Sequence, residues 1–359
     1  MASGGRGQWG GLVIFLALAG CVNDHSPNVM FERLLERVSN VTEVEADPES
    51  TVASLPAYPR PRDLTLSLDD VRVGFGTFHG LGRCRLLGEV SARNSSLGKV
   101  QSVTARLLYE LRFYRQLQVC LDELRQTEKR DDDFLAEAQD IASRKRANLP
   151  LIYWNATFAS PEFRMLMNTA AEPLARDSEP AVADITDALG YITRIGMTLE
   201  SGAEIVENGP LESRYFVLQS GKLVGPLLQG MAVSRDYLAR ASHLLESVAS
   251  QNQLCPMGKK TRRSEHLFNV FQKFYIGEVQ PYLSLLHTQA RPVFEGINDL
   301  LKVQKAPVPS AFQAFYDATI NPDISTSVWK GFNDDIARHT RAWQKVLGQC
   351  DLMPKPPEN

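Results

Sequence analysis

The chain has 359 residues, of which 43% are hydrophobic and 23% charged, and its formal net charge is −3. These values are ordinary for a globular protein, and the length allows one large domain or two smaller ones. The near-balance of charge argues against nucleic acid as a principal ligand, which would normally require a basic surface. Six scattered histidines and the absence of a Cys-x-x-Cys pattern leave little material for a metal site, so neither a metal nor a cofactor is predicted.

The first 20 residues have the features of a secretory signal peptide. Residues 12–19 (LVIFLALA) form an apolar run that is too short to span a membrane, which takes about 20 residues. Leu18-Ala19-Gly20-Cys21 then resembles a bacterial lipobox, in which small residues fit the peptidase and the cysteine thiol carries the lipid. We therefore predict cleavage before Cys21 and a lipid anchor on Cys21. The alternatives are an ordinary signal cut elsewhere, or an accidental apolar start.

A lipid on Cys21 predicts a location in the cell envelope of a Gram-negative bacterium. Val22 follows the cysteine, where an aspartate would favour retention in the inner membrane. We therefore expect the mature chain on the periplasmic face of the outer membrane, with the membrane as its first partner.

Beyond the anchor, apolar residues recur mostly at helical spacing. Residues 28–39 predict a short helix, and the acidic stretch with Pro56, Pro59 and Pro61 predicts either a tether to the main body or a strap across it. Later helices are expected at 103–126, 133–147, from 161, at 180–199, 225–252 and 265–290, and after Ser310 and Ser325.

Breaks and glycines refine this pattern. Pro281 should kink the helix at 265–290, and "ENGP" at 207–210 should interrupt helical structure. Five glycines in residues 69–92 weaken an isolated helix but permit close packing. Alternation typical of a strand occurs only in 64–68. The sequence therefore predicts an all-α fold, a single bundle of eight to ten helices over 66–359, after a signal peptide (1–20) and a lipidated N-terminus with a short helix and proline-rich tether (21–65).

Four cysteines remain once Cys21 is assigned to the lipid. Disulfides persist in the periplasm, and the three possible pairings of four cysteines stay open. Neighbourhood in the sequence favours Cys84 with Cys120, and Cys255 with Cys350. Buried thiols are the alternative, whereas a zinc site lacks the paired ligand spacing.

Several charged or glycine-rich motifs have structural explanations. "GFGTFHG" at 74–80 lacks the lysine and hydroxyl residue of a phosphate loop. Asp131–Asp133 suits a helix N-terminus, and Arg144–Arg146 suits a helix C-terminus. Lys259, Lys260, Arg262 and Arg263 form a basic loop that is either solvated or in contact with anionic headgroups.

One enzymatic alternative is a lytic transglycosylase, a class of cell-wall enzyme that uses a catalytic glutamate followed by serine. Glu200-Ser201 and Glu212-Ser213 offer this pair, but "LLQGM" at 227–231 matches the downstream motif poorly. No Gly-x-Ser-x-Gly or His-Glu-x-x-His motif is present in the sequence.

Several stretches resemble an uncharacterised proteobacterial lipoprotein family, the domain of unknown function 3080. They are "RNSSLGKV" (93–100), "LLYEL" (107–111), "YWNATFASPEF" (153–163), "LFNVFQKFYIGEVQPYL" (267–283) and "WQKVLGQC" (343–350). The four cysteines fall where that family carries cysteines, which implies two disulfides. The resemblance implies no catalytic residues.

The motif at 93–98 is typical of a turn, in which asparagine and serine satisfy backbone groups. Arg93 and Asn94 are also candidates for a polar binding pocket. The leading hypothesis is a lipid-anchored, non-enzymatic binding or assembly module of the envelope, with an envelope protein or cell-wall component as its partner.

Overall fold

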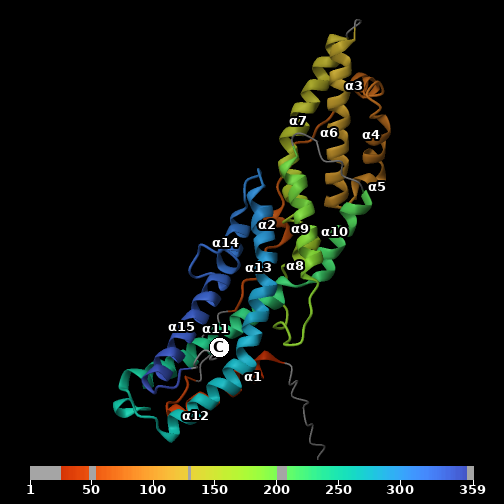
Figure 1. The fold of residues 1–359 in the computed structure, drawn as a ribbon. Helices are drawn as coiled ribbons and strands as arrows, with labels where there is room; N and C mark the ends of the chain where they lie inside the picture. The colour runs from red at the N-terminus through yellow and green to blue at the C-terminus, as the bar shows by residue number, and fades with distance from the viewer. Residues whose placement is uncertain (1–25, 48–53, 128–130, 200–207, 354–359) are drawn as a thin grey trace, which may run out of the picture.

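The computed structural model describes residues 26–47, 54–127, 131–199 and 208–353, which contain helices and connecting loops but no strand (Figure 1). Nine helices in these ranges have ten residues or more: α1 (Pro27–Thr42), α6 (Val103–Gln126), α7 (Asp132–Ala156), α9 (Val182–Met197), α10 (Asn208–Gly221), α11 (Val224–Gln251), α13 (Gln280–Lys302), α14 (Ser310–Thr319) and α15 (Val328–Gln349). The shorter α-helices are α2 (Pro61–Leu64), α3 (Phe75–Gly80), α4 (Leu87–Asn94), α5 (Ser96–Lys99), α8 (Pro161–Leu166) and α12 (Arg262–Val270). The predicted all-α fold is confirmed.

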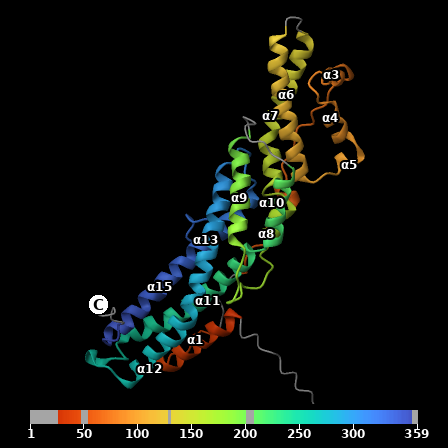
Figure 2. The ribbon, with the colours of Figure 1, turned by 45° about the vertical axis from the view of Figure 1, so that its right-hand side comes forward.

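The molecule is elongated, with its helices stacked from one end to the other (Figures 1 and 2). At one end α6 and α7 pack along each other, flanked by α3, α4 and α5. In the middle α13 packs against α9, and α10 contacts both α8 and α9. At the other end α11 packs against α15 and α1. One large apolar core runs through these contacts.

The amino-terminal helix α1 belongs to this body. Its apolar face, which the sequence predicts, is buried, and Phe31 stacks on Tyr237 with ring centroids 5.4 Å apart. Arg263 donates to the last carbonyl groups of α1, those of Val41 and Thr42. Arg262 and Arg263, which were predicted to lie in a loop, are the first two residues of α12, and Arg263 caps the C-terminal end of α1.

The proline-rich segment lies across the body. Over the described residues 54–74, which we name the strap, the second of the two predicted alternatives holds. The Tyr58 hydroxyl donates to the Phe158 carbonyl at 2.7 Å, and Thr169 donates to the Pro56 carbonyl at 2.9 Å. Tyr58 is buried between Phe312 and Phe315 of α14, so the strap joins helices that are distant in sequence.

Helix boundaries differ from the prediction beside several prolines. Helix α7 continues to Ala156 with Pro150 inside it, so residues 144–146 lie in mid-helix rather than at a C-terminus. Pro210 lies in the first turn of α10, a helix that the sequence pattern did not predict. Pro281 is the second residue of α13, which a π-helical segment, η2 (Phe271–Val279), connects to α12 without a break. Helix α13 then continues to Lys302 with Pro292 inside it, beyond the predicted end at residue 290. A proline lacks the N–H for one i→i−4 hydrogen bond, and the backbone hydrogen bonds before Pro281 follow the π-helical instead of the α-helical pattern.

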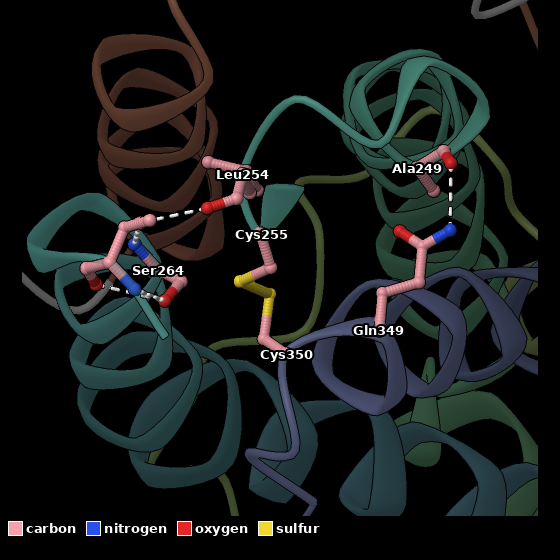
Figure 3. Close-up of a disulfide and its surroundings, with 7 residues drawn as sticks. Ala249, Leu254, Cys255, Ser264, Gln349 and Cys350 are labelled. Atoms are coloured by element: carbon pink, nitrogen blue, oxygen red, sulfur yellow. Dashed lines mark hydrogen bonds between the residues drawn. A yellow bond between two sulfur atoms is a disulfide. The ribbon is translucent and has the colours of Figure 1, made fainter. Parts of the chain in front are cut away.

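Two disulfides join the predicted cysteine pairs, Cys84–Cys120 and Cys255–Cys350. Figure 3 shows the second, which connects the loop after α11 to the end of α15. Hydrogen bonds hold both sides of it: Thr261 donates to the Leu254 carbonyl, and Gln349 donates to the Ala249 carbonyl at 2.8 Å.

Candidate functional site

The site is built on helix α7, which carries the strap along its surface. Asn155 accepts the Leu66 N–H at 2.8 Å and donates to the Leu66 carbonyl at 2.9 Å. Two turns earlier on α7, Asn148 accepts the Asp69 N–H at 3.1 Å and donates to the Asp69 carbonyl at 2.9 Å. Each asparagine side chain therefore satisfies both backbone groups of one strap residue, as the backbone of a neighbouring strand would do in a sheet.

A small helical lobe, formed by α3 to α5 (residues 75–99), stands beside the strap. The Cys84–Cys120 disulfide attaches this lobe to α6. Against α7, Gly80 lies so close that an added Cβ atom would be 2.4 Å from the ring of Phe134. The expectation that these glycines permit close packing is confirmed at this position.

Between the strap, the lobe and helices α6 and α7 lies a cleft of about 790 Å³. A second hollow of about 430 Å³ continues along the strap, and the two share Asp69, Asp70, Arg93 and Arg106. The larger hollow by itself is within the size range of small-molecule sites.

The floor of the cleft contains a buried ion pair between α6 and α7. Lys145 Nζ is 2.7 Å from Glu110 Oε2, with side-chain exposures of 13% and 4%. The ammonium group also lies over the rings of Tyr109 and Phe113, at 5.4 and 4.9 Å from their centroids. Burial raises the pKa of the Tyr109 hydroxyl well above its usual value, and Glu110 adds to this effect while Arg93 opposes it. Glu110 is thus paired with a cation at short range.

Arg93 and Asn94, the two residues that the sequence singled out, both line the cleft. They end α4, and the turn that follows is the predicted one: Ser95 caps α5 by accepting the Gly98 N–H at 3.0 Å. Arg93 is half-buried and donates one Nη1 bond to the Gly98 carbonyl. A structural role for the turn and a polar lining therefore coexist in this motif.

Arg106 on α6 is the second guanidinium of the cleft. Its side chain is 35% exposed, and its closest carboxylate oxygen, Oε1 of Glu110, is 3.9 Å from Nε. That Nε is buried without a hydrogen-bond acceptor in the described part of the chain. Arg106 can therefore donate to a group that enters the cleft.

Sequence reasoning missed Lys145, Glu110 and Arg106. A signal was present, because Lys145 falls in the apolar stripe of α7 and Glu110 in that of α6. A charged residue in such a stripe on two successive helices indicates a buried pair, since a buried charge needs a partner.

The other candidates do not meet at this cleft. Glu212 is exposed on α10, and the alternative candidate Glu200 lies outside the described residues, as do Cys21 and residues 1–20. Lys259, Lys260 and Arg262 are exposed near the far disulfide.

Within the described ranges, no group of three or more His, Cys, Asp or Glu side chains is arranged to hold a metal ion. Nor does any described helix combine the length and the apolarity that crossing a membrane requires.

Comparison with known proteins gives one finding. We found no match among curated proteins or among solved structures. A family described as protein of unknown function, DUF3080, matches residues 31–354, which include the strap, the lobe and all four disulfide cysteines. The chain belongs to the DUF3080 family.

Proposed function

We propose that this protein is a lipid-anchored binding module of the Gram-negative periplasm that holds a ligand in the cleft between the lobe and helices α6 and α7. The observation that supports this proposal is the cleft itself, which Arg93, Asn94 and Arg106 line together with the buried Lys145–Glu110 pair. The lipobox at Cys21 supports the anchor, and the two disulfides support an oxidising compartment.

Binding rather than covalent chemistry is supported by the pairing of two of the three carboxylates of the cleft, the third being Asp69, which is exposed on the strap. A glycan-cleaving enzyme of the transglycosylase type needs a carboxyl group that can donate a proton. Glu110 is held by Lys145 at 2.7 Å, and Asp70 is held by Arg72 at 2.6 Å. The Arg72 guanidinium lowers the pKa of Asp70, which keeps this group charged.

Site-specific photocrosslinking in intact cells tests the cleft. A photoreactive phenylalanine analogue at Phe78, which lines the cleft, should give a discrete adduct. The matched control is Phe216, which is 67% exposed on α10 and outside the cleft. Arg106→Gln should reduce the Phe78 adduct and leave any Phe216 adduct unchanged. Equal labelling at both positions, or no adduct at Phe78, would contradict binding in the cleft.

The anchor needs a separate experiment. Cells fed a radioactive fatty acid should label the wild-type protein, and Cys21→Ser should abolish both the label and the mature amino terminus at residue 21. Fractionation of the envelope then distinguishes the outer from the inner membrane. Retention of the label in Cys21→Ser would overturn the lipid anchor.

A further inference from the structure

The charges that line the cleft do not balance. Five cationic side chains and three carboxylates face it. Two of the cations are engaged at short range, Arg72 with Asp70 and Lys145 with Glu110. Three cations (Arg93, Lys99 and Arg106) and one carboxylate (Asp69) are then left, so the charged groups available to a ligand are mainly positive.

The two arginines lie where the cleft and its extension meet. Arg93 and Arg106 line both hollows, and both act on the same neighbour, the hydroxyl of Tyr109. Guanidinium groups bind carboxylates and phosphates through paired N–H donors, and the Nε donor of Arg106 has no acceptor among the described residues. Asp69 and Asp70, which line the same part of the cleft, are exposed on the strap, whereas both arginines are half-buried.

Part of the cleft lining is apolar. It includes Phe78, Val90 and Phe113, and also Phe75, which has 86% of its surface exposed. An aromatic side chain so exposed beside a cleft is suited to cover the apolar part of a ligand.

We propose that the cleft binds an anionic amphiphile, whose carboxylate or phosphate group pairs with Arg93 and Arg106 and whose apolar portion packs on Phe75, Phe78 and Val90. This assignment rests on the proposed function and adds the chemical class of the ligand. The size of the cleft fits one chain of such a molecule rather than a protein surface.

Calorimetric titration of residues 22–359, exported behind a cleavable leader and purified without detergent, tests the proposal. The probes are dodecyl phosphate and laurate below their micellar concentrations, with dodecyl maltoside and inorganic phosphate as controls. We expect one molecule of at least one of the two anionic probes to bind per chain. Dodecyl maltoside, which has the same chain without the charge, and inorganic phosphate, which has the charge without the chain, should each bind about tenfold more weakly or worse. The relative affinity of the two anionic probes identifies phosphate or carboxylate as the preferred group.

Variants of one helix give a matched comparison. Arg106→Gln should weaken binding of the anionic probe about tenfold or more, because one charge-assisted pair is lost. Arg115→Gln changes the same charge on an exposed position of α6 outside the cleft and should have no effect. Asp69→Asn removes a like charge from the rim and should leave the affinity equal or higher.

Three results would overturn the proposal: equal affinity for dodecyl maltoside, equal affinity for inorganic phosphate, or no binding of either anionic probe. Any of them, combined with a persistent Phe78 adduct in cells, would leave the cleft as a binding site for another class of ligand. Loss of the Phe78 adduct would instead overturn the proposed function itself.

Discussion

The indole N–H of Trp343 donates to Nε2 of His339 at 2.8 Å, and both side chains are fully buried on the inner face of α15. Since Nε2 is the acceptor, the imidazole proton lies on Nδ1, which faces the Ser242 hydroxyl at 2.9 Å. The Ser242 hydroxyl in turn donates a hydrogen bond to the Leu238 carbonyl at 2.6 Å. His339 is thus neutral and satisfied on both nitrogens.

This arrangement predicts acid sensitivity of the fold. Burial lowers the pKa of His339 from 6.5 to about 3, with the Leu238 carbonyl and Glu246 opposing the effect. The folded state therefore binds fewer protons than the unfolded state in this window, so stability is complete above pH 6.5 and falls as the pH drops towards 3. Each pH unit below 6.5 should cost about 1.4 kcal/mol of the free energy of unfolding.

Urea unfolding between pH 7.5 and 4.5 measures this slope. Replacement of the histidine by the non-titrating His339→Gln should lower stability at pH 7.5 and flatten the slope. His243→Gln, at an exposed position of α11, is the control and should leave the slope unchanged. A slope as steep in His339→Gln as in the wild type would assign the acid sensitivity to other groups.

A second prediction concerns the ion pair at the cleft floor. Lys145→Met leaves the Glu110 carboxylate buried without its closest partner and should destabilise the protein by about 3–5 kcal/mol. The double variant Glu110→Leu with Lys145→Met removes both charges and should recover most of this loss. Chemical unfolding of both single variants and the double variant completes the thermodynamic cycle. Additive losses in the double variant would show that the two residues are not coupled.

Local patterns in the sequence predicted much of this fold. Helix α6 has the predicted bounds, because its leucine stripe is regular and the Ser102 hydroxyl caps it by accepting the Ala105 N–H. The full length of α7 was missed, since Pro150 normally ends a helix and tertiary contacts retain it here. The start of α10 was missed because Pro210 occupies a first turn, where its missing N–H costs no bond.

The cleft was predictable only in part. Arg93 and Asn94 stand out in sequence because turn chemistry surrounds them. The pairing of Lys145 with Glu110 depends on how α6 lies along α7, which local periodicity does not determine. The side-chain bonds that hold the strap join residues about 80 to 90 positions apart, and no local pattern encodes them.

Those bonds give a third prediction. Asn155→Ala leaves the N–H and carbonyl of Leu66 without their partners, which should cost roughly 1–3 kcal/mol for each group. Asn155→Asp keeps an acceptor for the N–H but sets a carboxylate against the carbonyl oxygen, so it should be no milder than alanine at neutral pH. Gln139→Ala, at an exposed position of the same helix, is the control for lost helix surface.

Limited proteolysis and urea unfolding measure the two effects of this change. Cleavage within residues 64–74 should accelerate in both Asn155 variants, while the Gln139 variant keeps the wild-type rate. Wild-type cleavage rates in the Asn155 variants would show that the strap is held by its other contacts.

The disulfide of the lobe leads to the last prediction. Cys84–Cys120 closes a separation of 36 residues that includes α4 and α5, and the chain-entropy model assigns roughly 4 kcal/mol to such a loop. Besides this bond, the lobe is attached by the buried side chains of Leu81 and Leu86, by the close contact of Gly80 with Phe134, and by polar bonds such as Arg83 to Asp131 at 2.9 Å. The double variant Cys84→Ser with Cys120→Ser should therefore loosen the lobe before it unfolds the bundle.

Hydrogen exchange read out by mass spectrometry distinguishes these outcomes. Amides of α3 to α5 should exchange faster in the Cys84/Cys120 variant, while those of α11 and α15 keep their protection. The Cys255/Cys350 variant should show the reverse pattern, since that bond joins the loop after α11 to the end of α15. Because the lobe forms one wall of the cleft, the first variant should also bind the anionic probe more weakly than the second. Uniform acceleration along the whole chain in both variants would show that the disulfides stabilise the molecule globally, and the lobe would then not be a separately held wall.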